Sequence, residues 1–183
     1  GLRGLGWDLI SSGGTAKALR DADLAVTDVA DLTGSPAILG HRVVTLHPKV
    51  HGGILADRRN PDHQADMAEH GIDPIDLVVS NLYPFGASLD SFEHGASRAE
   101  ELIDIGGPAM IRAAAKNFKD VGILTHPSQY QQVLDELKAD GVLSDATKRQ
   151  LARTAFAHTA AYDAAIVGWF DDVAGTALPP TLH

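Results

Sequence analysis

The sequence contains no cysteine, which excludes a disulfide framework, a thiolate nucleophile and a thiolate zinc site. It also lacks any apolar run near the ~20 residues that a helix needs to span a bilayer. The opening residues 1–6 do not contain the apolar segment of a signal peptide. We therefore expect a cytoplasmic protein.

Positive charge is scarce as well. The chain has 15 Lys and Arg residues against 24 Asp and Glu, which gives a formal net charge of −9. This balance disfavours non-specific binding to nucleic acid or to an anionic membrane. It is compatible with a phosphorylated small molecule, because such a ligand needs only a few backbone N–H groups and one or two cations. We expect a small-molecule ligand, with no nucleic acid and no membrane as partner.

What the sequence does contain is an alternation of strand-like and helix-like segments. This alternation is typical of an α/β fold with a wound, mostly parallel sheet flanked by helices, and 183 residues fit a single domain. We place the domain at residues 1–172 and a linker at 173–183. In such folds ligands bind where the strands end. Strands are predicted at residues 7–10, 24–29, 43–46, 76–80 and 121–124, and helices at 16–21, 63–70, 108–116, 128–138 and 144–170.

A glycine loop at residues 11–15 follows the first predicted strand and opens a helix. Its two glycines, hydroxyl groups and N–H groups could hold a phosphate without a nearby lysine. The alternative is an ordinary strand-to-helix turn with Thr15 as the cap. The loop matches neither the Rossmann fingerprint nor the Walker pattern, so the loop by itself favours neither interpretation.

The stretch at residues 103–117 places a carboxylate, Asp104, just before a Gly-Gly pair and Pro108. Proline suits the first position of a helix, which predicts a helix of about two turns from Pro108 to Lys116. Asp104 and Lys116 then mark opposite ends of one element, as chemically useful groups could. The spacing alone favours another interpretation, in which Asp104 caps the helix and Lys116 complements its dipole.

Two pairs of side chains lie four residues apart. His47 and His51 could share a metal on a helix, but no third ligand has a suitable spacing and Pro48 makes a regular helix doubtful. Histidines bonded to loop backbone are the better interpretation. His158 and Tyr162 would share a helix face, where packing or a subunit contact is favoured.

Taken together, these segments resemble the IMP cyclohydrolase domain of the bifunctional AICAR formyltransferase/IMP cyclohydrolase family. The motifs are ISSGGTAK at 10–17, RVVTLHPKVHGGIL at 42–55, VSNLYPF at 79–85, the 104–117 stretch, and AFAHTAAYD at 155–163. The resemblance implies a methylglyoxal-synthase-like sheet. Three family features are not found: a further strand and loop before Trp7, a lysine where Val44 stands, and the large formyltransferase domain.

The resemblance also implies a reaction. The family closes the purine's second ring by converting 5-formamidoimidazole-4-carboxamide ribotide to IMP with loss of water, the last step of de novo purine biosynthesis. It implies no metal and no organic cofactor, a homodimer, and fusion to a formyltransferase domain. The alternative is a non-catalytic module that senses a nucleotide or phosphate. The implied catalytic residues are Lys116, Asp104 and Tyr83, and the implied substrate-binding residues are Ser12, Gly13, Gly14, Thr15, Arg42, Thr45, Asn81, Gly106 and Gly107.

Overall fold

The computed structural model describes residues 1–82, 85 and 100–174. Within them the strands form two parallel pairs. β1 (Ile10–Ser11) pairs with β2 (Thr27–Asp28), and β3 (Leu77–Val79) pairs with β4 (Gly122–Leu124). The predicted parallel α/β class is confirmed. The strands are shorter than predicted, however, and the described ones form two sheets rather than one.

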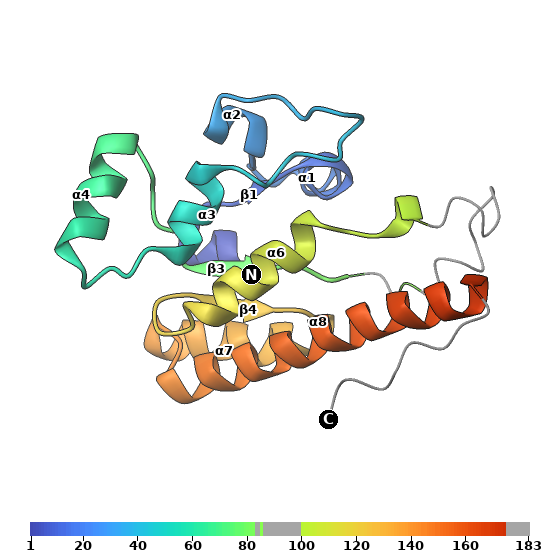
Figure 1. The fold of residues 1–183 in the computed structure, drawn as a ribbon. Coiled ribbons are helices and arrows are strands. Elements are labelled where there is room, and N and C mark those ends of the chain that lie inside the picture. The colour runs from blue at the N-terminus through green and yellow to red at the C-terminus, as the bar shows by residue number, and fades with distance from the viewer. Residues whose placement is uncertain (83–84, 86–99, 175–183) are drawn as a thin grey trace.

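Helices make up most of the remaining described chain (Figure 1). Their bounds are α1 Gly13–Asp21, α2 Val29–Thr33, α3 Pro48–Leu55, α4 Pro61–His70, α6 Gly106–Lys116, α7 Tyr130–Asp140 and α8 Asp145–Ala174, with 3-10 turns at Leu2–Leu5 and Pro127–Gln129. Because α8 continues to Ala174, the first two residues of the predicted linker are helical.

Several helix ends follow directly from local sequence. Gly141 stops α7 with a left-handed φ of 74°, as its position predicts. Ser144 precedes α8 and accepts a hydrogen bond from the Thr147 N–H at 3.2 Å. Asn60 caps α4 in the same way, one residue before Pro61.

Three predicted boundaries were wrong. Pro48 does not interrupt a helix but is the first residue of α3, where a missing N–H costs nothing. The α6 helix begins at Gly106, two residues before Pro108, since proline is also tolerated elsewhere among the first free N–H positions. Residues 43–46 form no strand; only an isolated antiparallel bridge joins Val43 to Ile38.

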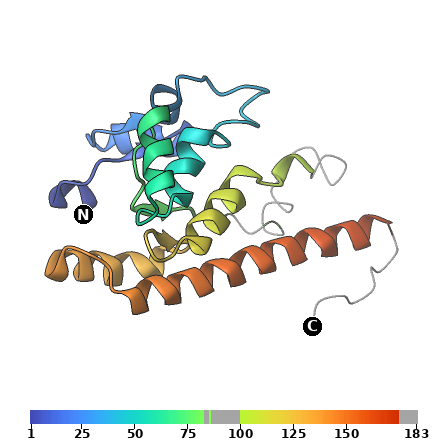
Figure 2. The same cartoon turned by 60° about the vertical axis from the view of Figure 1, so that its left-hand side comes forward.

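The core lies around α6. This helix contacts α8, α3, β3 and β4, and the two views show α8 running along one side of the molecule beneath it (Figures 1 and 2). Small buried residues such as Ala114 and Ala155 allow these helices to approach closely, while Ile111 and Ile123 fill the space between them. The core thereby fixes the start of α6 relative to the strands, and that start carries Asp104, Gly106 and Gly107.

Candidate functional site

The glycine loop connects β1 to α1. Ser12 occupies the N-cap position, and its side chain makes no capping hydrogen bond within the part of the chain that the structure describes. Gly13 has a left-handed φ of +54°, a conformation that glycine adopts readily. Thr15 lies inside α1 and is not its cap. Ser12, Gly13 and Gly14 line a hollow of about 730 Å³ together with residues of the 28–44 segment. The loop therefore presents a helix N-terminus to an open space.

A second turn, at residues 104–107, leads into α6. The Asp104 Oδ1 atom accepts a hydrogen bond from the Gly107 N–H at 3.1 Å, and the Asp104 N–H donates to the Tyr162 hydroxyl at 2.8 Å. Asp104 thus precedes the N-cap Ile105 and bonds the first turn of α6, which is close to the capping role that spacing alone favours. This role occupies one carboxylate oxygen in one bond, and an ionised carboxylate can accept about four. A substrate amide could therefore bind the same side chain.

The Gly-Gly pair allows two side chains to approach this turn. A Cβ atom on Gly107 would lie 2.3 Å from Asp104 Oδ2 and 2.8 Å from Leu82 Cδ2. A Cβ atom on Gly106 would lie 2.7 Å from the Thr45 hydroxyl oxygen. The absence of side chains at both positions therefore brings Thr45, Asp104 and the start of α6 into contact.

Asn81 follows β3 and lies at the carboxyl end of that strand. Its side-chain N–H donates to the Tyr130 hydroxyl at 2.5 Å. The next residue, Leu82, is buried and packs against Gly107, which links the end of β3 to the Asp104 turn. Tyr83 lies outside the described residues.

Two of the predicted site residues, Arg42 and Lys116, carry positive charge. Arg42 forms an ion pair with Glu101, close in sequence to Asp104. Lys116 is the exposed last residue of α6, so the helix length of about 15 Å separates it from Gly106. The adjacent Asn117 donates to the backbone carbonyls of Ile54 and Ala56 at 2.8 and 3.0 Å. Asp104 and Lys116 therefore lie at opposite ends of α6, as their spacing predicts.

Sequence reasoning missed the two tyrosines that hold the site. Tyr130 and Asn81 are 49 residues apart, and no local pattern links them. Tyr162 was assigned to packing; it also bonds the backbone of Asp104, and burial raises the pKa of its hydroxyl. In the sequence, only the spacing of Tyr162 four residues after His158 on one helix face pointed to this tyrosine.

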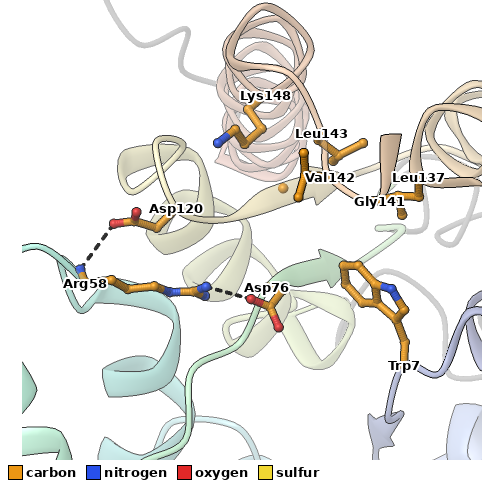
Figure 3. A pocket seen from close by; sticks show the side chains of 10 residues that line it. Trp7, Arg58, Asp76, Asp120, Leu137, Gly141, Val142, Leu143 and Lys148 are labelled. Atoms are coloured by element: carbon orange, nitrogen blue, oxygen red, sulfur yellow. Dashed lines mark hydrogen bonds and ion pairs between the residues drawn. The ribbon is translucent and has the colours of Figure 1, made fainter. Parts of the chain in front are cut away.

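A smaller hollow of about 220 Å³ lies at the other ends of the strands, beside Asp76 and Gly122 (Figure 3). The Arg58 guanidinium donates to Asp76 at 2.6 Å, and the Arg58 N–H donates to Asp120 at 3.4 Å. Trp7 forms one wall. Arg58 thus bonds both acidic residues of this hollow, the Lys148 ammonium donates to the Lys119 carbonyl, and no predicted site residue lines the hollow.

The histidine pair does not form a metal site. The His47 ring accepts a hydrogen bond from the Lys49 N–H and caps α3. His51 is partly buried, and burial lowers the pKa of its imidazole. Among the described residues, no three His, Asp or Glu side chains are grouped to hold a metal ion, and no helix is long and apolar enough to cross a membrane.

Comparison with known proteins identifies the family. The MGS-like domain family matches residues 1–109, which is more than half of the chain. The chain belongs to the MGS-like domain family. The AICARFT/IMPCHase bienzyme family matches residues 114–183 of this MGS-like protein. The resemblance that the sequence motifs indicate is thereby confirmed.

Individual proteins similar to this chain support the same assignment. The bifunctional purine biosynthesis protein PurH of Synechococcus sp. (strain WH7803) is 56% identical over 168 residues, covering 91% of this chain and 32% of the relative. PurH of Parvibaculum lavamentivorans is 53% identical over 180 residues, covering 97% and 33%. The chain thus spans about a third of the length of these curated relatives. The crystal structure of ForH matches with a TM-score of 0.81 and 42% identity, over 92% of this chain and 88% of ForH.

Proposed function

We propose that the protein is an IMP cyclohydrolase, which closes the ring of 5-formamidoimidazole-4-carboxamide ribotide to give IMP and water. The observation that carries the proposal is that the candidate functional groups lie where strands end and helices begin. The glycine loop follows β1, Asn81 follows β3, and Asp104 precedes α6 with Thr45 against Gly106. Parallel α/β folds bind ligands at such carboxyl ends of strands. The similarity to PurH proteins supports a role in purine biosynthesis.

The reaction needs positioning more than it needs a strong nucleophile. The carboxamide nitrogen attacks the formyl carbon and gives up one proton, while the formyl oxygen takes up a proton to become a hydroxyl. The carbinolamine then loses this hydroxyl together with the proton of the former formamide nitrogen as water, and a C=N bond forms. An amide nitrogen is weakly nucleophilic and hydroxide leaves poorly, so the site must orient both substituents and move protons between them. No cofactor takes part in the proposal.

Each described group has a role that its position supports. Asp104 accepts the carboxamide N–H with the oxygen that does not bond the Gly107 N–H, and so orients the nucleophile. Asn81 and Thr45 add polar contacts, and the Gly106 N–H faces the developing negative charge. Residues 12–15 bind the ribotide phosphate at the start of α1. Arg42 reaches the ligand when its pair with Glu101 opens. Lys116 and Tyr83 complete the proposed catalytic group: Lys116 donates a proton or stabilises charge, and Tyr83 contacts the reacting groups.

A non-catalytic nucleotide-sensing module is the second candidate. The observation in its favour is that Asp104 already has a structural role at the start of α6, and Arg42 already has an acidic partner. A sensor would bind IMP through the glycine loop without turnover. It would also leave the 81–85 segment without a function.

The deciding experiment is a spectrophotometric cyclisation assay on the full-length protein that carries this chain. Asp104→Asn retains an oxygen for the Gly107 N–H but removes the charge, so the fold should survive while kcat falls by about 10²–10³. Asp66→Asn on the exposed surface of α4 is the matched control. IMP binding without turnover in the unmodified protein would favour the sensor.

The proposal extends to assembly: a homodimer fused to a formyltransferase domain, as the family resemblance implies. The PurH relatives are named as bifunctional proteins. Phe156, Val167 and Phe170 are 40–50% exposed along α8, which gives that helix apolar surface for a partner. Light scattering that finds only monomers at high concentration would contradict the dimer.

A further inference from the structure

The hollow at the glycine loop contains a single side chain that can carry positive charge. Of its described lining residues, only His41 is basic. The nearby cations have acidic partners: Lys17 pairs with Asp21, and Arg20 pairs with Asp28. The exposed His41 imidazole has no hydrogen bond or ion pair among the described residues.

The backbone places His41 in this hollow at an energetic cost. Leu39 and His41 both have left-handed φ values, +53° and +69°. Residues other than glycine rarely adopt this backbone conformation. The bridge between Ile38 and Val43, with N–O distances of 3.1 and 3.4 Å, closes the turn that holds them. Strain of this kind persists where the surrounding structure fixes it, and it is concentrated at functional sites.

The described charged groups around the hollow do not supply an unpaired positive charge for a bound anion. The Asp28 carboxylate also lines it, and the Ala30 N–H together with Arg20 holds the pKa of Asp28 below its usual range. Asp28 therefore stays ionised at neutral pH and repels an anion. Arg42, next to His41, is paired with Glu101. A ligand phosphate at residues 12–14 thus needs a further positive group, and imidazole can supply one near neutral pH.

We propose that the His41 imidazolium binds the phosphate of the nucleotide held by the glycine loop, as a specificity-determining contact. The inference rests on the proposed function and names a residue for it that the sequence motifs do not. His41 acts in binding and takes no part in proton transfer during ring closure. Its loss should therefore raise KM for the ribotide and leave kcat nearly unchanged.

The test measures IMP binding by calorimetry with the full-length protein at pH 6.5 and 8.5. Both values lie above the second phosphate pKa of about 6, so the ligand charge changes little between them. Unmodified protein should bind IMP several-fold more tightly at pH 6.5 than at pH 8.5, because imidazole groups gain positive charge as the pH falls through the neutral range. His41→Gln should bind about equally at both values, and His70→Gln on exposed α4 should behave as the unmodified protein does.

Two further variants separate binding from folding. His41→Gly removes the imidazole and relieves the positive φ, so IMP binding should weaken while Tm holds or rises by up to about 4 °C. Val44 lines the same hollow, so Val44→Lys added to His41→Gln should restore affinity and make it independent of pH. Unchanged IMP affinity in His41→Gln, or a Tm that falls in His41→Gly, would overturn the inference. Protein that binds IMP through His41 but never cyclises the ribotide would overturn only the proposed catalysis.

Discussion

Gly107→Ala tests how closely the Asp104 carboxylate is positioned. The new methyl group would lie 2.3 Å from Asp104 Oδ2, and real Cβ contacts are almost never under 3.0 Å. The oxygen must therefore move by at least 0.7 Å. It cannot retreat freely, because the Asp104 N–H is bonded to Tyr162 and the methyl group also meets Leu82 at 2.8 Å.

Three effects set the change in the free energy of unfolding that Gly107→Ala should cause. Overpacking costs about 1–3 kcal/mol, and a weakened cap costs about 1 kcal/mol. The better helix propensity of alanine returns about 1 kcal/mol, which leaves a loss of about 1–3 kcal/mol in the free energy of unfolding. A misplacement near 1 Å at a reacting group can cost about 10²-fold in rate. We expect kcat for ring closure to fall by about that factor, with a smaller change in KM.

Gly168→Ala is the matched control, since it makes the same change within α8 where no atom lies within 4 Å of the added methyl group. It should stabilise the protein by up to about 1 kcal/mol and leave turnover unchanged. Thermal melts and the cyclisation assay on both variants give the comparison. Wild-type kcat in a folded Gly107→Ala protein would refute the positioning role of Asp104.

The remaining predictions use the same assays. Gly14→Val should raise KM strongly at unchanged Tm, because a side chain there meets no protein atom within 4 Å and projects from the loop that lines the hollow; an unchanged KM would remove the loop from the site. Lys116→Ala should lower kcat by about 10²–10³, because Lys116 is proposed to donate a proton or stabilise charge during ring closure, and a near-normal kcat would remove this residue from the catalytic group. Burial lowers the pKa of His51 below 6.5 in the folded protein. The unfolded chain therefore binds a proton that the folded chain resists, so stability falls as pH drops through about 6.5. Tm of the His51→Met variant should depend less on pH than that of the unmodified protein, and an equal pH dependence would contradict the assignment.

Some of this structure was determined by short stretches of sequence. Gly141 ends α7 because a left-handed residue is needed there, and glycine adopts that conformation at no steric cost. The alternation of strand and helix segments predicted the parallel α/β class. The order of the motifs predicted the MGS-like family that the comparisons show. The helix stop acts within a few residues, and the alternation and the motif order can be read directly along the chain. None of these signals therefore requires knowledge of the fold.

Other features were decided by contacts between distant segments. Asp104 meets Tyr162 across 58 residues of sequence, and Asn81 meets Tyr130 across 49. The close approach of Thr45 to Gly106 likewise follows from how α6 packs in the core. Such partners are chosen by the packing of whole helices and strands, which no spacing along the chain encodes. The sequence could therefore supply the candidate residues of the site, while the packing of α6 against β3 and α8 determined which of them meet.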